Sequence, residues 1–239
     1  MARFPSDNYR LIAPDVPGYY IAQIDPKVKF SRNYFNQWID AFVDSLGLEK
    51  FHLVAHSLST MVGIFYGAAR KQRLHSLILA NAPDIFMPES TAKGGLVEDF
   101  LESIQVKSGD EWYQSVSRLF YRKPQIPRLI REYNYNVVAK NLDSADNFLE
   151  FILRLRPQVI TNSTQLRCPV LLITSDHDVS ASNGFAEKVI SNFNSASTVN
   201  LIRCGHMSYL EKQSDYISGL YKHLESIHGN SRLMKDQYA

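Results

Sequence analysis

The sequence contains little cysteine and no concentration of charge of one sign. Cys168 and Cys204 are the only two cysteines among its 239 residues, and they stand too far apart for a C-x-x-C motif. Neither a zinc site nor a dithiol redox site is therefore indicated. The 26 lysines and arginines nearly balance the 24 aspartates and glutamates, giving a net charge of +2, and no basic run stands out. This balance argues against a nucleic-acid partner.

Long hydrophobic runs are absent as well. No apolar stretch approaches the roughly 18 residues that a membrane-spanning helix needs. The beginning of the chain, MARFPSDNYR, lacks the apolar core of a secretory signal. We expect no membrane span and, from the scarcity of cysteine, a reduced cytoplasmic setting. Because 45% of the residues are hydrophobic and 21% are charged, the chain can build the core of one ordinary domain.

Short apolar runs are present instead, and they alternate with helical patterns. Helices are predicted over residues 31–47, 58–70 and 207–227, and a further helix is capped by Ser182 or Asn183. This alternation predicts an α/β fold, with a mostly parallel sheet flanked by helices on both faces. The predicted strands cover residues 9–13, 51–55, 75–80, 169–174 and 198–203.

The rhythm changes between residues 84 and 165. Aromatic and charged residues mix there at helical spacings, and no strand-like run is clear. We interpret this stretch as a mostly helical insertion. Its aromatic residues are expected to form a core of its own, with a few of them lining a pocket. They are Phe86, Trp112, Tyr113, Phe120, Tyr121, Tyr133, Tyr135, Phe148 and Phe151.

Ser57 stands at the junction of a predicted strand and a predicted helix. The residues two before and two after it, Ala55 and Ser59, are both small, as a sharp and crowded strand-to-helix turn requires. Such a turn lies at the carboxyl end of a parallel strand, where binding sites form. The helix that follows also offers backbone N–H groups to an oxyanion. Ser57 is therefore a candidate nucleophile, or else an ordinary helix N-cap.

A serine nucleophile needs a base and a group that orients the base. Of the seven histidines, His206 follows the last predicted strand and a glycine, so it also lies at a carboxyl strand end. Asp176 and Asp178 follow the strand before it and supply two candidates for the acid. The order along the chain is Ser, Asp, His.

Four segments in this order resemble the α/β-hydrolase family. YRLIAPDVPGYY resembles its D-x-P-G-x-G segment, FHLVAHSLST its nucleophile elbow, VLLITSDHD its acid loop and LIRCGHMSYLEK its base loop. The resemblance runs from the family's fourth core strand to the end of the chain. It implies a triad of Ser57, Asp178 and His206, with the Leu58 N–H in the oxyanion hole and no metal or organic cofactor. It also implies a core over residues 1–83 and 166–232, a helical cap over 84–165 and a tail over 233–239.

The chain departs from the family pattern at its front. The family's first three core strands are missing, and the loop after the third normally gives the second oxyanion-hole donor, for which the sequence has no candidate. A truncated gene model, an alternative start and a rearranged sheet are three interpretations. Asp84 stands where some family members carry their acid, and a turn or hinge residue is the alternative there.

The resemblance implies a serine hydrolase that cleaves an ester of a small molecule, as carboxylesterases and lipases do. The alternative is a non-catalytic interaction protein of the same fold, or an inactive truncated form. KFHL and LHSLILANA loosely resemble maspardin-like proteins of that non-catalytic kind, which lose the histidine that this chain keeps at His206.

Overall fold

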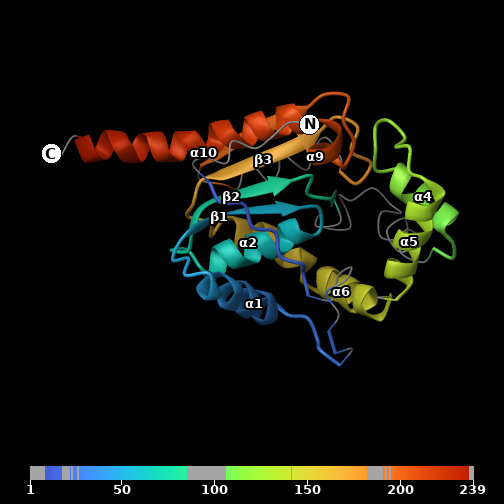
Figure 1. The fold of residues 1–239 in the computed structure, drawn as a ribbon. Coiled ribbons are helices and arrows are strands. Elements are labelled where there is room, and N and C mark those ends of the chain that lie inside the picture. Colours follow the sequence, from blue (N-terminus) through green and yellow to red (C-terminus); the bar gives the residue numbers. More distant parts are fainter. Residues whose placement is uncertain are drawn as a thin grey trace.

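A parallel sheet of four strands organises the fold (Figure 1). The computed structural model describes residues 9–17, 22, 24–25, 27–84, 106–140, 142–181, 191, 193 and 195–236, without the side chains of 142–145 and 229–236. The strands lie in the order in which they occur in the sequence, and every neighbouring pair is parallel. They are β1 (Phe51–His56), β2 (Leu74–Ala80), β3 (Val170–Ser175) and β4 (Ala196–Leu201).

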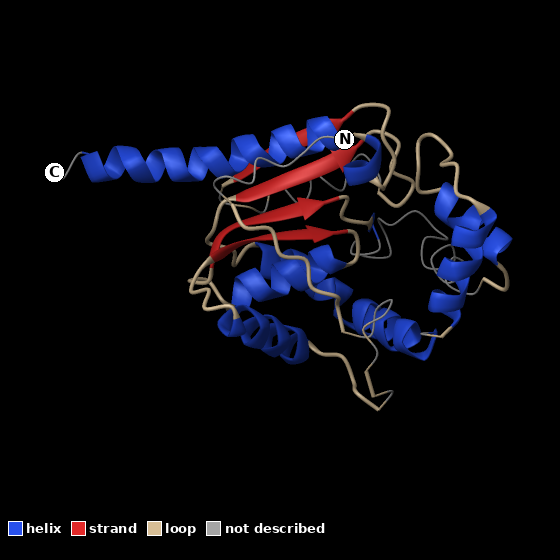
Figure 2. Cartoon of the chain, viewed as in Figure 1, coloured by secondary structure: helices blue, strands red, loops and turns tan. Residues whose placement is uncertain are grey.

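Helices cover both faces of this sheet, as the alternating pattern predicts. Figure 2 shows α1 and α2 on one face and α10 across the other. No described helix has the length and apolar character to cross a membrane. The helices are α1 (Arg32–Ser45), α2 (Ser59–Ala69), α4 (Gly109–Ser117), α5 (Arg128–Ala139), α6 (Leu142–Leu155), α7 (Val159–Ser163), α9 (Ser208–Glu211) and α10 (Gln213–Asp236), with a short 3₁₀ turn, η2 (Arg156–Gln158).

Helix α1 begins and packs as its sequence predicts. The Ser31 side chain accepts a hydrogen bond from the Tyr34 N–H at 3.0 Å, which satisfies one of the free donors at the helix start. Phe35, Ile39 and Val43 recur every four residues and are buried. This spacing places them on one face, which packs into the core.

The core has two halves, one on each face of the sheet. Leu77 and Leu79 of β2 face the half covered by α1 and α2. Ile78 and Ala80 face the half covered by α10. All four are fully buried, and each leucine or isoleucine contributes about 1.5–3 kcal/mol by leaving water. The sequence of a central parallel strand, which is buried on both faces, is therefore a continuous apolar run.

The segment between β2 and β3 is helical in its described part. Residues 85–105, with the predicted core residue Phe86, lie outside the described residues. Phe148 and Phe151 of α6 pack against Phe35, with ring centroids 5.8 and 5.0 Å away. The expectation that they belong to a separate core of the insertion is therefore wrong, because α6 docks on the main core. The division into core, cap and tail stays a prediction.

The strand predicted over residues 9–13 does not form. These residues have no regular structure, and Leu11 and Ile12 are 66% and 38% exposed. A strand needs a hydrogen-bonded neighbour, and among the described strands β1 pairs only with β2. The segment instead lies against α10, where the Tyr9 hydroxyl donates to Glu225 Oε1 at 3.2 Å.

Two other boundaries differ from those expected from the sequence. The last strand ends at Leu201 rather than residue 203, because Ile202 is exposed and Arg203 turns the chain with φ of +54°. The last predicted helix forms as two helices, α9 and α10, and α10 continues to Asp236. The helix predicted after Ser182 or Asn183 lies outside the described residues.

Three histidines meet at the amino-terminal end of the sheet. The His52 ring lies 5.2 Å from that of His75 and 5.3 Å from that of His228 on α10. The His52 Nε2 and His228 Nε2 atoms are 3.2 Å apart, which requires one of them to be an unprotonated acceptor. Burial, with the nearby His75 and His228, lowers the pKa of His52 to about 4.

This cluster makes the fold sensitive to acid. The unfolded chain binds protons near the ordinary histidine pKa of 6.5, whereas folded His52 binds them only near 4. The contribution of His52 to the free energy of unfolding is therefore fully present above about pH 6.5, and it is lost as the pH decreases toward about 4. Thermal melts across this range should lose less stability in His52→Gln than in the wild type. Tyr9→Phe, which changes no histidine, should lose as much stability between pH 6.5 and pH 4 as the wild type does, and equal losses in all three proteins would contradict this origin.

Candidate active site

The turn between β1 and α2 holds Ser57 in a strained backbone conformation. Ser57 has φ of +56°, a value uncommon for residues other than glycine. The turn is fixed from both sides: the Ser57 N–H donates to Ala80 O at 2.9 Å, and the Thr60 hydroxyl donates to Ser57 O at 2.6 Å. Strain of this kind persists only where the surrounding structure enforces it, and it is common at functional sites.

A glycine further along α2 allows the helix to approach the sheet. A Cβ added at Gly63 would lie 3.2 Å from Ala55 Cβ and 3.2 Å from Leu77 Cδ1. The close contact between helix and sheet therefore falls one turn after Ser59. Ser59 uses its hydroxyl to donate to His56 O at 2.7 Å. This arrangement explains how α2 can carry a serine side chain, rather than a bare Cα, at position 59.

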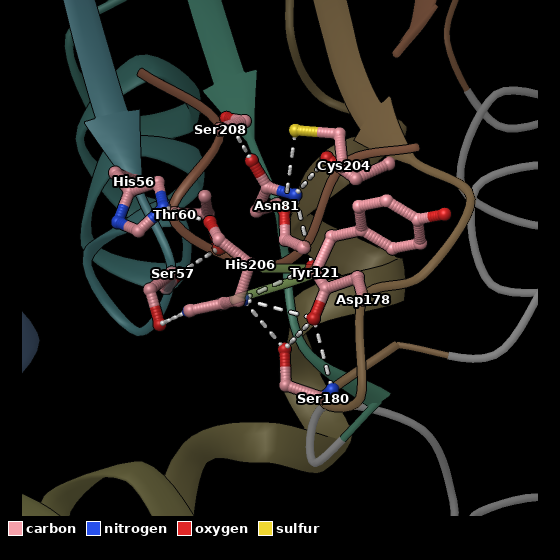
Figure 3. Close-up of polar contacts among 12 residues, drawn as sticks. His56, Ser57, Thr60, Asn81, Tyr121, Asp178, Ser180, Cys204, His206 and Ser208 are labelled. Atoms are coloured by element: carbon pink, nitrogen blue, oxygen red, sulfur yellow. Dashed lines mark hydrogen bonds and ion pairs between the residues drawn. The ribbon is translucent and has the colours of Figure 1, made fainter. Parts of the chain in front are cut away.

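His206 lies between Ser57 and Asp178 (Figure 3). It follows β4, and its side chain is buried. Its Nε2 is 2.7 Å from Ser57 Oγ, and its Nδ1 is 3.0 Å from each carboxylate oxygen of Asp178. With the proton on Nδ1 donated to Asp178, Nε2 is free to accept the hydroxyl proton of Ser57.

Asp178 is a buried carboxylate with a full set of donors. Oδ1 accepts from the Ser180 N–H at 2.9 Å and from the Ser180 hydroxyl at 2.7 Å. Oδ2 accepts from Asn81 Nδ2 at 2.9 Å. Burial by itself would raise the pKa of Asp178, but the hydrogen bonds from His206, Ser180 and Asn81 and the electrostatic interaction with His206 outweigh it and lower that pKa. The group is therefore ionised at neutral pH, as an orienting acid requires.

Asp176, the other candidate acid, faces the backbone of the base loop. Its carboxylate accepts from the Arg203 N–H at 2.9 Å and the Cys204 N–H at 3.1 Å, and it pairs with His177 Nδ1 at 2.8 Å. Although desolvation opposes it, these donors lower the pKa of Asp176 to about 2. The structure thus brings Asp178 to His206 and uses Asp176 to hold the loop that carries the base. The Asp84 N–H donates to Ser180 O at 2.8 Å, next to the acid loop.

Leu58 occupies the start of α2. Its φ of −57° and ψ of −31° place it at the N-cap of this 11-residue helix. The first N–H groups of a helix have no partner within the helix, and together they attract negative charge. The Leu58 donor expected from the sequence stays a prediction.

Two residues that contact the candidate triad, and a third that contacts one of these two, were not expected from the sequence. Ser180 bonds to Asp178, and its Oγ also lies 2.8 Å from His206 Nδ1. Asn81, with φ of +50°, bridges Asp178 and the Ser208 hydroxyl, which donates to its Oδ1 at 2.5 Å. An asparagine directly after a buried strand is the one local sign of that role, because asparagine tolerates this backbone conformation.

His56 connects the elbow to the base loop. Its Nε2 donates to His206 O at 2.9 Å. Burial, together with the nearby His206, lowers the pKa of His56 to about 4. It is therefore neutral near pH 7 and keeps the ring nitrogen opposite Nε2 unprotonated. Among the described residues, no three His, Cys, Asp or Glu side chains are grouped so that they could hold a metal ion.

Comparison with known proteins agrees with this architecture. The model of the alpha/beta hydrolase fold family matches residues 1–213. The chain belongs to this family. Its strand-to-helix elbow and the loops after β3 and β4 thus belong to an alpha/beta hydrolase fold.

Several relatives are similar to this alpha/beta hydrolase over most of its length. A strigolactone esterase of Arabidopsis thaliana is 24% identical over 230 residues, which is 86% of this chain and 78% of the relative. The structure of a putative lipase from Acinetobacter baumannii matches with a TM-score of 0.80 at 17% identity, over 91% of this chain and 75% of the lipase. That of a meta-cleavage product hydrolase from Pseudomonas fluorescens matches with a TM-score of 0.75 at 16% identity, over 95% and 82%.

The positive φ at Ser57 predicts a difference in the free energy of unfolding that does not depend on catalysis. Ser57→Gly should be more stable than Ser57→Ala by about 0.5–1 kcal/mol, because glycine adopts this conformation without a Cβ clash. Urea denaturation measures the difference. The same pair of substitutions at Ser226, inside helix α10, should give the opposite order by about 1 kcal/mol. The same order at both sites would argue against strain at Ser57.

Proposed function

We propose that this alpha/beta hydrolase is a serine hydrolase that cleaves an ester bond in a small molecule. The observation that carries the proposal is the continuous contact from Ser57 through His206 to Asp178. The two distances, 2.7 Å from His206 Nε2 to Ser57 Oγ and 3.0 Å from His206 Nδ1 to Asp178, support the roles of nucleophile, base and orienting acid for these residues.

The reaction follows from these contacts. Ser57 Oγ attacks the ester carbonyl carbon while His206 Nε2 takes its proton. The imidazolium that forms lies against the ionised Asp178 carboxylate. The Leu58 N–H stabilises the oxyanion of the tetrahedral intermediate, and His206 then returns the proton to the leaving alcohol. Water attacks the acyl-enzyme by the same route and releases the acid.

The identity of the relatives favours an ester substrate. The similar Arabidopsis thaliana protein is named an esterase and the similar Acinetobacter baumannii protein a putative lipase. Both names describe cleavage of esters, and the chemistry of a serine, a histidine and a carboxylate fits that reaction without a cofactor. We also propose a reduced cytoplasmic setting for the protein. This part of the proposal rests on the two free cysteines.

A fluorophosphonate probe tests the assignment of Ser57 and His206. The probe should label the folded wild-type protein on Ser57, and Ser57→Ala or His206→Ala should abolish labelling. Ser226→Ala and His75→Ala, which change a serine and a histidine remote from the elbow, should leave labelling intact. Circular dichroism establishes that each sample is folded. A folded wild type that takes no label would reject the serine hydrolase and favour a non-catalytic interaction protein.

The assignment of the acid has its own test. Asp178→Asn should slow ester hydrolysis by about 10³–10⁴-fold, because the amide stabilises the wrong tautomer of His206. Asp176→Asn should cost less than about tenfold, because Asp176 bonds to backbone N–H groups and not to the base. Hydrolysis of p-nitrophenyl acetate measures both. A larger loss in Asp176→Asn would show that the acid is wrongly assigned.

A further inference from the structure

The carboxylate of Glu211 joins two segments that lie far apart in the sequence. Glu211 is the last residue of α9, and its Oε2 accepts from the Gly205 N–H at 2.7 Å and from the Tyr121 N–H at 3.0 Å. Its Oε1 accepts from the Arg122 N–H at 3.0 Å. Gly205 directly precedes His206, whereas Tyr121 and Arg122 follow α4 in the insertion. One side chain thus bonds the insertion to the loop of the candidate base.

The two segments also touch directly around His206. The Met207 N–H donates to Leu119 O at 3.3 Å. On the other side of His206, a Cβ added at Gly205 would lie 2.6 Å from Leu119 O and 2.6 Å from Tyr121 N. Only glycine allows this approach, because the opposing atoms belong to the backbone and cannot rotate away. Both neighbours of His206 are therefore in contact with residues 119–122.

The same segment reaches the loop of the acid. The Tyr121 ring packs edge-on against His177, with centroids 4.6 Å apart. The His177 N–H in turn donates to Cys204 O at 3.0 Å. Figure 3 shows Tyr121 beside the loops that carry Asp178 and Cys204. Residues 119–122 therefore bridge the loops that carry the acid and the base.

We propose that Glu211 is a positioning residue that clamps residues 119–122 of the insertion onto the loop of His206. A charged carboxylate that accepts three backbone N–H groups makes a stronger and more directional link than neutral hydrogen bonds would. Whatever displaces the segment after α4 then displaces Gly205 and, with it, the imidazole. The effect on catalysis rests on the proposed function of Ser57, Asp178 and His206. The hydrogen bonds that form the clamp do not depend on that function.

Hydrogen–deuterium exchange tests the clamp without reference to activity. In Glu211→Ala, amide exchange should become faster both in residues 119–122 and in residues 203–207. Glu211→Gln keeps one acceptor oxygen, so its exchange should lie between those of the wild type and the alanine variant. Glu49→Ala, an exposed glutamate in the turn before β1, is the control and should exchange like the wild type. Unchanged exchange in either segment of Glu211→Ala would overturn the clamp.

Kinetics then test its role in positioning. For p-nitrophenyl acetate, Glu211→Ala should lower kcat about 10- to 100-fold with little change in KM, because a small displacement of the base costs rate and not binding. Glu211→Gln should recover part of the loss. Adding Gly205→Ala to Glu211→Ala should lower kcat by much less than Gly205→Ala alone, because both changes disrupt one contact. Rates are compared per folded molecule.

The outcomes separate this inference from the proposed function. A wild type that hydrolyses and labels, with kcat unaltered in Glu211→Ala, would overturn the positioning role while leaving the triad intact. An inactive wild type in which Glu211→Ala still accelerates exchange in both segments would reject the serine hydrolase and support the clamp.

Discussion

The burial of the Asp178 carboxylate places demands on several parts of the chain at once. A buried charge is tolerated only if donors replace the water that it has lost. Those donors come from Asn81 at the end of β2, from Ser180 on its own loop and from His206 after β4. Because the strands are parallel, their carboxyl ends meet at one edge, and this shared edge makes the convergence possible.

Patterns that act over a few residues could be predicted from the sequence. The α1 cap at Ser31, the apolar runs of β1 to β3 and the crowded elbow at Ser57 each depend on neighbouring residues. Bringing Ser57 and His206 to one edge with Asp176 or Asp178 needed only one further step, whereas the choice of Asp178 rested on the resemblance to the α/β-hydrolase family. Each follows a strand in the same parallel sheet, so each is carried to the same edge.

Features that depend on distant partners could not be predicted in this way. Residues 9–13 have the composition of a buried strand, yet they lie outside the sheet because no described strand pairs with them. Phe148 and Phe151 carry no sign that they pack on α1. Glu211 and Tyr121 are 90 positions apart in the sequence, and no local sequence pattern predicts a contact between them.

The position of β1 in the sheet affects how the protein responds to heat. β1 carries Ser57 at its carboxyl end, and within the described sheet it is held by hydrogen bonds to β2 alone. Strands with one partner open at a lower free energy than strands paired on both sides. On warming, we therefore expect β1 and the Ser57 turn at its carboxyl end to open before β2 and β3, which are each paired on both sides.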